Sequence, residues 1–318
     1  MNYLEQLTLR LAHGAAEFPE AFRMRHAEYL RRAQRDDGGF AGREGPSDLY
    51  YTGFALRGLA LLGELNDDVA RRATDYLRSR LSGRTPMIDF LSLVQGAMLL
   101  EISAGLDVFA AAPTGWREAA AAMFEQFRRP DGGYAKTDEG QASSTYHTFL
   151  MVITRQLIGQ PPVDPERLIA FIRARRRDDG GFVEIGPMRK SGANPTAAAV
   201  GLLNTLGALD DPLRQGAIDF LIAMQSDEGG IKANTRIPIA DLLSTCTGVL
   251  TLSDLGALDA IDLPEARRYA QSLQFDRGGF RGAAWDEAAD VEYTFYGLAT
   301  LALCAVEDRQ KEPAAWPT

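Results

Sequence analysis

The feature that most constrains this chain is a helix pair joined by a Gly-Gly turn. Residues Gln271 to Cys304 show it most fully: an amphipathic segment ends at Gln274, a turn runs through Gly278 and Gly279, and a mostly apolar segment begins near Asp290. Paired glycines supply the positive φ angles that end a helix. Asp290 stands where an N-cap acceptor satisfies the free N–H groups of the next helix. The unit therefore predicts two helices and a turn.

This unit recurs along the chain. Gly-Gly pairs begin at residues 38, 132, 180, 229 and 278, with spacings of 94, 48, 49 and 49 residues. Because 94 is twice 47, a copy without glycines is expected between the first two pairs, from about Leu81. A threonine keeps step in the second helix, at Thr52, Thr148, Thr196, Thr245 and Thr294. Six copies predict an array in which each helix pair packs against its neighbours.

Interlocking repeats predict a single domain within the 318 residues. We expect an extra N-terminal helix in 1–24, six repeats in 25–305 and a loose tail in 306–318. The 46% hydrophobic content suffices for a large core. A net charge of −9 argues against nonspecific nucleic-acid binding, which needs clustered Lys and Arg.

The sequence also bears on the compartment. Two cysteines, Cys246 and Cys304, form no spaced framework, so we expect no disulfide scaffold and a reducing cytoplasm. Neither an N-terminal apolar leader nor a run of about 18 apolar residues is found, so neither secretion nor a transmembrane segment is expected.

The repeat, with its Asp-Gly-Gly-aromatic turn, resembles that of protein prenyltransferase β subunits and of squalene or terpene cyclases. Two segments, Gly38 to Leu62 and Gly278 to Leu303, are especially similar to the β subunit of Rab geranylgeranyltransferase. The resemblance covers roughly residues 25–305. It implies an all-α fold, an (α/α)6 toroid with six parallel inner helices around a cavity and six antiparallel outer helices. An open superhelix is the alternative.

Basic residues recur in the loops that lead into the second helices. In a closed ring these helices point their N-termini at one rim, where their dipoles favour an anion. Forked guanidinium groups bind phosphate oxygens well, so these loops predict a diphosphate site. The alternative is pairing with nearby glutamates. The predicted ligands are Arg43, Lys136, Lys232, Arg236 and Arg281. The resemblance implies that Arg43 binds the diphosphate of an isoprenoid diphosphate substrate.

The second helices also predict the cavity wall. Repeats 1, 3 and 6 are aromatic there, whereas repeats 4 and 5 carry small residues. One bulky and one small side leave room for an elongated apolar ligand such as an isoprenoid chain, although ordinary core packing remains the alternative. The substrate-binding candidates on these helices are Tyr50, Phe54, His147, Tyr293 and Tyr296.

The zinc motif of protein prenyltransferases is altered in this chain. That family holds zinc with Asp-x-Cys at the start of one inner helix and a histidine in the next repeat. Here Asp290 is followed by Glu292 in place of the cysteine, and Tyr51 stands at the histidine position, while Asp48 matches its family position. The two lost ligands are those that favour zinc. We therefore predict no metal ligands, and leave magnesium open.

The segment from Asp290 to Thr294 also partly matches the Asp-x-Asp-Asp-Thr motif of class II terpene cyclases. Glu292 stands at the position of the proton donor, and burial raises the pKa of a carboxyl as a donor requires. The predicted catalytic residues are Asp290, Glu292, Asp48 and Tyr51. In the alternative, Asp290 caps a helix and Glu292 pairs with an arginine.

The leading interpretation is a prenyltransferase-like enzyme that binds an isoprenoid diphosphate in its cavity and transfers the prenyl group to an unknown acceptor. The resemblance implies a helical-repeat α-subunit-like partner. Two alternatives stay open: a class II-type terpene cyclase that uses Glu292 and Asp290 as acid, and a non-catalytic isoprenoid-binding or scaffold protein.

Overall fold

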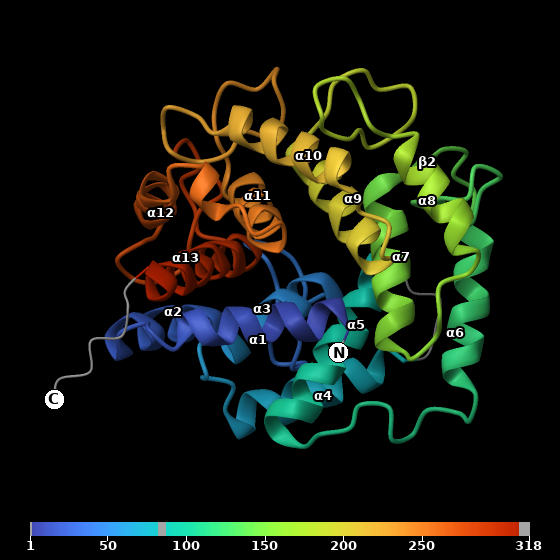
Figure 1. Ribbon diagram of the computed structural model, residues 1–318. Helices are drawn as coiled ribbons and strands as arrows, with labels where there is room; N and C mark the ends of the chain where they lie inside the picture. Colours follow the sequence, from blue (N-terminus) through green and yellow to red (C-terminus); the bar gives the residue numbers. More distant parts are fainter. Residues whose placement is uncertain (1, 82–86, 312–318) are drawn as a thin grey trace, which may run out of the picture.

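The computed structural model describes residues 2–81 and 87–311. Its helices form two concentric layers (Figure 1). The inner layer is α3 (Leu49–Leu61), α5 (Met87–Ala104), α7 (Thr145–Leu157), α9 (Ala193–Thr205), α11 (Leu242–Asp254) and α13 (Val291–Lys311). The outer layer is α2 (Glu20–Arg32), α4 (Asp67–Ser79), α6 (Trp116–Phe124), α8 (Pro165–Arg173), α10 (Asp211–Met224) and α12 (Leu263–Ser272). Each predicted repeat, including the copy without glycines, contributes one pair.

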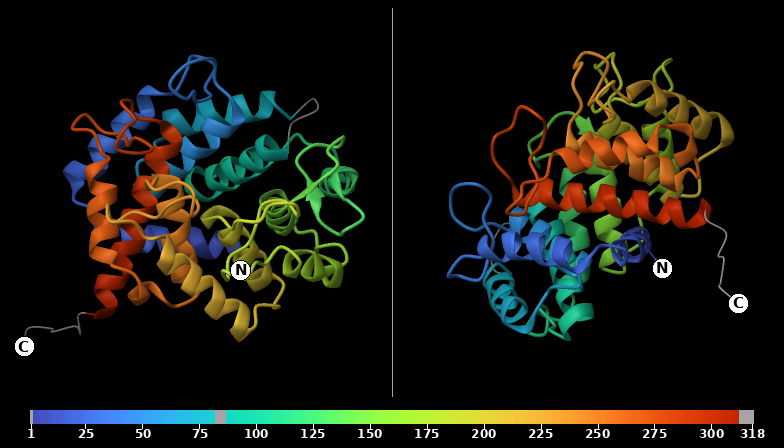
Figure 2. Two further views of the ribbon diagram at one scale, coloured as in Figure 1. Left: turned by 90° about the horizontal axis from the view of Figure 1, so that it is seen from above. Right: turned by 90° about the vertical axis from the view of Figure 1, so that its left-hand side faces the viewer.

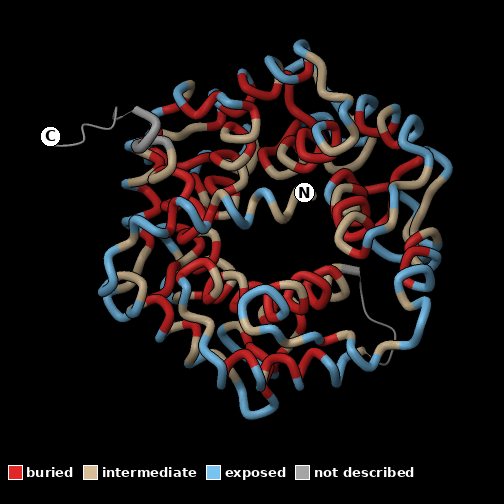
Figure 3. Tube along the Cα trace, turned by 60° about the horizontal axis from the view of Figure 1, so that its bottom comes forward, coloured by how far each residue is buried: buried red, intermediate tan, exposed pale blue. Residues whose placement is uncertain are grey.

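The ring is closed. Each inner helix contacts the next in chain order from α3 to α13, and α13 contacts α3 again. Figure 3 shows this ring with its buried residues concentrated between the two layers. The predicted (α/α)6 toroid is therefore confirmed, and the open superhelix is excluded.

Glycine pairs hold successive repeats together. Gly38 has φ +87°, and a Cβ placed on it would lie 2.1 Å from the carbonyl oxygen of Arg72 on the next outer helix, α4. Gly278 has φ +90° and packs in the same way, 2.3 Å from the carbonyl oxygen of Arg25 on α2. Only glycine permits both the backbone angle and the close approach. The last repeat therefore docks on the first repeat as each repeat docks on its successor.

The threonine that keeps step in the sequence has a structural role. The Thr294 hydroxyl donates to the Asp290 carbonyl at 2.6 Å and accepts the Phe280 N–H at 3.1 Å. Thr52 makes the equivalent pair of bonds with Asp48 and Phe40. Each threonine thus ties the turn after a Gly-Gly pair to the start of its inner helix, and satisfies a buried N–H.

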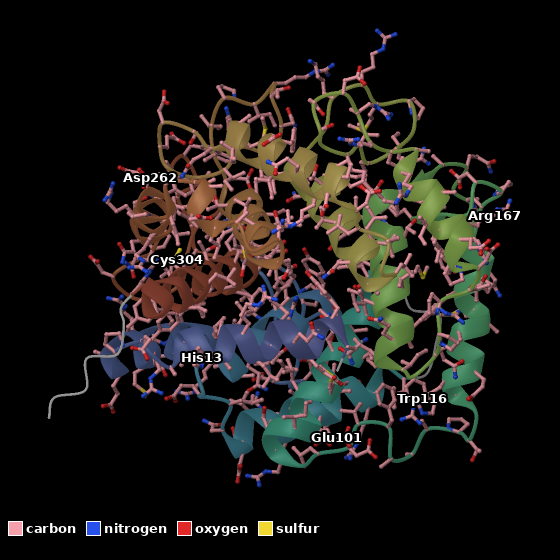
Figure 4. All side chains as sticks on the ribbon, in the orientation of Figure 1. His13, Glu101, Trp116, Arg167, Asp262 and Cys304 are labelled. Atoms are coloured by element: carbon pink, nitrogen blue, oxygen red, sulfur yellow. The ribbon has the colours of Figure 1, made fainter. Side chains whose placement is uncertain are left out.

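Local sequence explains where the helices start and which way they face. Asp48, Asn66 and Asp241 are N-caps whose carboxylate or amide oxygens accept N–H groups of the first turn. On outer helix α4 an apolar stripe is buried, whereas its charged face is exposed, as at Arg71. Arg167 and Asp262 likewise lie at the outer edge of the ring (Figure 4).

A further helix, α1 (Tyr3–Ala15), precedes the first repeat and lies alongside α13 across one end of the ring (Figure 2). The Tyr3 hydroxyl and the Arg10 guanidinium both bind Asp254, the last residue of α11, at 3.1 and 2.7 Å. α1 therefore covers the end of the ring where the inner helices finish. The predicted boundary at residue 24 falls within α2, and α13 continues past 305; residues 312–318 lie outside the described part.

The remaining elements are short. They are the 3-10 turns η1 (Glu125–Phe127) and η2 (Leu258–Ala260), and the strands β1 (Tyr134–Ala135) and β2 (Ser143–Ser144), which pair antiparallel with Tyr134 opposite Ser144. This ladder lies in one loop before an inner helix. No helix in the described residues has the length and apolar character needed to cross a bilayer.

Candidate functional site

An acidic cluster lies where the last repeat meets the first. α13 begins directly after Asp290, whose carboxylate accepts the Glu292 N–H at 2.8 Å. The Tyr50 hydroxyl of α3 donates to a Glu292 carboxylate oxygen at 2.7 Å. Asp48 is the N-cap of α3 and accepts the Tyr51 N–H at 2.7 Å. Ring closure thus brings Asp290, Glu292, Asp48 and Tyr51 to one seam from residues some 240 positions apart.

Burial controls the electrostatics of this cluster. It raises the pKa of Glu292 above the usual carboxyl value, although hydrogen bonds from Tyr50 and Tyr296 oppose the shift. Burial also raises the pKa values of Asp290 and Asp48. The pKa of Tyr51 rises to about 12, first through burial and then through the nearby carboxylates. Glu292 therefore holds a proton more tightly than a carboxyl in water does, and its ionised form is less favourable than in water.

Aromatic rings form the wall beside the cluster. The ring of Phe54 lies 4.9 Å from Tyr50 and 5.3 Å from Tyr296, centroid to centroid. Tyr293 lies 6.4 Å from Tyr296. On the facing helix α7, Tyr146 keeps 36% of its surface accessible although it is on an inner helix, so open space remains beside it. The predicted wall residues Tyr50, Phe54, Tyr293 and Tyr296 therefore lie together.

Arg43 is engaged in ion pairs. Its guanidinium makes a two-pronged contact with the Asp286 carboxylate, and its Nε lies 3.5 Å from a carboxylate oxygen of Asp290. Arg281 donates to two backbone carbonyls, those of Asp286 and Ser272. These contacts show what holds the two cations at the seam. Their role as diphosphate ligands stays a prediction.

A pocket of about 480 Å³ lies between the loops that precede α9 and α11. We call it the rim pocket, and Arg189, Lys190 and Arg236 are its basic lining residues. Residues 185–191 and 232–240 contain four basic and no acidic residues. Glu184 also lines the pocket, but it accepts the Ser144 hydroxyl of the neighbouring repeat. The rim pocket is therefore positively charged, although the protein as a whole carries a net negative charge.

The start of α9 borders the rim pocket. Gly192 is its N-cap, and Gly192 and Asn194 line the pocket. The Ala193 N–H donates to the Ala233 carbonyl at 2.9 Å and Pro195 has no N–H, so the basic side chains, more than the helix start, give the pocket its preference for an anion. The other predicted cations lie elsewhere: Lys232 is half-buried outside the pocket, and Lys136 is exposed beside His147 in the third repeat. His147 accepts or donates a hydrogen bond with Ser144 at 2.9 Å.

A second space of about 250 Å³, the inner cavity, lies between α1 and the ends of the inner helices. Its walls are mainly apolar and include Leu4, Leu7 and Leu11 of α1. Among the described residues its one charged lining residue is Arg57 of α3. The Arg57 guanidinium carbon lies 4.0 Å from the Phe54 ring centroid and 4.6 Å from that of Phe295. Our sequence analysis missed Arg57, although a lone charge within an apolar inner helix was a visible signal.

A side-chain hydrogen bond links residues that line the two spaces. The Thr247 hydroxyl donates to the Asn194 side-chain oxygen at 2.6 Å. Asn194 lines the rim pocket, whereas Thr247 lines the inner cavity.

The residues at the seam do not fit zinc. Among the residues that the structure describes, no group of three or more His, Cys, Asp or Glu side chains is placed to hold a metal ion. Glu292 is bonded to Tyr50 and Asp290 to Arg43. Cys246 lines the inner cavity, and burial raises the pKa of its thiol to about 12, which disfavours the thiolate that zinc requires.

Comparison with known proteins agrees with this geometry. The model of the prenyltransferase alpha-alpha toroid domain matches residues 21–79 and 98–304. The chain belongs to this family. Its ring of six helix pairs, predicted from the Gly-Gly turns, is the family's toroid. No curated protein matches the chain.

Three solved structures show how widely the family's fold is shared. Candida albicans protein geranylgeranyltransferase-I, complexed with GGPP, is 16% identical with a TM-score of 0.72, over 88% of this chain and 90% of that one. The type II terpene cyclase MstE from Scytonema, with geranylgeranyl dihydroxybenzoate, is 14% identical with a TM-score of 0.61, over 95% and 99%. An alpha-1,6-mannanase from Salegentibacter is 12% identical with a TM-score of 0.61, over 90% and 98%. At such identities the likeness concerns the fold alone.

Proposed function

We propose that this toroid binds an isoprenoid diphosphate and transfers its prenyl group to an acceptor. The observation that carries the proposal is the cationic rim pocket beside an aromatic-walled ring interior. Arg189, Lys190 and Arg236 would hold the diphosphate through charge-assisted hydrogen bonds. The prenyl chain would pass Asn194 into the ring and lie against Tyr146, Tyr50 and Tyr296.

In the transfer reaction the protein mainly supplies charge that stabilises the leaving diphosphate, and holds the reactants in position. The bond between the prenyl C1 and the diphosphate oxygen breaks, and the diphosphate leaves with the electron pair towards the rim cations. A bond forms between C1 and the nucleophilic atom of the acceptor, which loses a proton. Aromatic faces stabilise positive charge developing on the chain. Ionised Glu292, held by Tyr50, is the base placed to accept the acceptor's proton.

A specific observation favours a second candidate, a class II-type terpene cyclase. Glu292 is a half-buried carboxyl whose pKa is raised by burial, and it lies against the aromatic wall. Protonated, it can donate its proton to a terminal alkene and start cyclisation, with Asp290 beside it. The two candidates need opposite protonation states of the same residue.

Product analysis separates these functions. The protein is incubated with geranyl, farnesyl or geranylgeranyl diphosphate, with and without candidate acceptors, and products are identified by mass spectrometry. Transfer releases diphosphate and gives an adduct heavier by the prenyl group. Cyclisation gives an isomer of the substrate. If the prenyl diphosphate binds but is recovered unchanged, the non-catalytic alternative is favoured. If no prenyl diphosphate binds, the proposal is contradicted. Repeating the assay with a helical-repeat α subunit added tests the expected partner.

A further inference from the structure

The inner cavity contains a charge that an apolar ligand does not explain. Its lining is mainly aliphatic and aromatic, yet Arg57 projects into it from the middle of α3. Arg57 is half-buried, and burial lowers the pKa of its guanidinium, which shows the cost of its charge there. A purely hydrocarbon ligand would add no partner for this cation.

The protein itself supplies Arg57 with little compensation. Its Nε donates to the Gly53 carbonyl at 3.1 Å, and its faces lie against Phe54 and Phe295. Among the described residues no carboxylate forms an ion pair with it. The charge of Glu292 favours the charged form of Arg57, but that carboxylate is hydrogen-bonded to Tyr50. Stacking leaves the guanidinium edge, with its two terminal nitrogens, as the part suited to a forked anion.

The cavity has its own entrance. Thr8 and Ala12 of α1 and Ser103 of α5 line it and are exposed, and Ile102 beside them is 70% exposed. It therefore reaches solvent between α1 and the end of α5. This mouth lies at the end of the ring where α1 crosses, opposite the rim pocket at the N-termini of the inner helices.

We propose that the inner cavity is a binding site for a small, mainly apolar carboxylic acid, whose carboxylate pairs with the Arg57 guanidinium. The aliphatic wall, including Leu7, Met98 and Leu250, receives the apolar body, and Gln95 and Thr247 are the polar groups beside it. A space of about 250 Å³ suits a molecule smaller than a long isoprenoid chain. In the proposed transfer this molecule is the acceptor, a role that rests on the proposed function, whereas the binding site does not.

The test compares an acid with the matching alcohol. Octanoate and 1-octanol are titrated into the full chain and into Arg57→Met, which keeps the length and apolar stem of the side chain. We expect octanoate to bind the native chain at least about tenfold more tightly than octanol, since hydrogen bonds to charged groups contribute this much. Arg57→Met abolishes that preference, while Arg57→Lys keeps part of it. Equal binding of acid and alcohol to the native chain overturns the proposal.

A second pair of variants locates the ligand. Leu7→Trp fills the cavity from α1, whereas Leu9→Trp adds the same bulk on the exposed side of that helix, where Leu9 is 59% exposed. Octanoate binding should be lost in Leu7→Trp and kept in Leu9→Trp. Binding that survives in Leu7→Trp places the acid elsewhere and contradicts the site. Arg57-dependent octanoate binding in a chain that binds no prenyl diphosphate would retain this inference and refute the proposed function.

Discussion

The Tyr50 hydroxyl donates a 2.7 Å hydrogen bond to Glu292 across the seam between the first and last repeats. The two residues stand at the starts of α3 and α13, which become neighbours only when the ring closes. A half-buried carboxyl held by a tyrosine at such a seam can act as base or as acid. The closure of the fold therefore assembles the candidate active site.

Replacing Glu292 with glutamine tests its role. The amide keeps the shape and still accepts the Tyr50 hydroxyl, but it cannot take up or release the proton. We expect turnover to fall by about 100-fold or more, as is typical when a general acid or base is lost, with stability unchanged or increased. Glu287→Gln, an exposed residue in the loop before α13, is the control. Normal turnover in Glu292→Gln would remove it from the catalytic assignment.

His26 makes ring closure sensitive to pH. It is fully buried on α2, and its Nδ1 accepts the Gly279 N–H at 3.0 Å. Burial and the nearby Arg25 lower its pKa from 6.5 to about 4. The folded state therefore disfavours protonation of His26. The part of the free energy of unfolding that depends on neutral His26 is present above pH 6.5 and is lost as the pH falls towards 4. At about 1.4 kcal/mol per pH unit the loss is about 3 kcal/mol.

Urea unfolding of the native chain and of His26→Gln, from pH 7.5 to 4, measures this loss. The variant should be less stable at pH 7.5 but lose less stability on acidification. His13→Gln, at an exposed histidine of α1, should follow the native curve. Parallel curves for the native chain and His26→Gln would show that His26 is not the group that titrates.

Gly278 offers a test of the seam with an internal control. Gly278 and Gly45 share nearly the same backbone angle, φ +90° and +89°, but a Cβ on Gly45 meets nothing within 4 Å. Alanine at Gly45 should cost about 1–2 kcal/mol through the backbone angle alone. Gly278→Ala adds a clash with the Arg25 backbone and should cost clearly more. Equal losses in the free energy of unfolding for the two variants, measured with denaturant, would mean that the seam accommodates the added methyl group at no cost.

Much of the fold was predictable from the sequence because the contacts that define each repeat are made between residues close together in the chain. The Gly-Gly spacing gave six helix pairs, and the in-step threonines such as Thr294 proved to be the bond that fixes each turn. Asp290 was expected to cap a helix, and its carboxylate does accept an N–H of the first turn. Such contacts lie within about 15 residues, where sequence patterns carry most information.

The site was harder to predict because its contacts join distant repeats. Arg43 pairs with Asp286, which is 243 residues away, and no local pattern pairs them; its expected contact with a diphosphate stays a prediction. Basic residues recur along the sequence in the loops before the inner helices, whereas within residues 2–81 and 87–311 those of two adjacent loops line one pocket, around Arg189 and Arg236. Arg57 was missed because the sequence cannot show that α1 closes a cavity above it.

The central claim is that the rim pocket binds the diphosphate of an isoprenoid. Calorimetric titration of farnesyl and geranylgeranyl diphosphate, with the matching alcohols, tests it most directly. We expect the diphosphates to bind more tightly than the alcohols. Arg189→Ala and Arg236→Ala should each weaken diphosphate binding about tenfold, the worth of a charged hydrogen bond. Arg71→Ala on the outer surface should change it little. No heat and no competition from either diphosphate, or equal affinity in all three variants, would contradict the account.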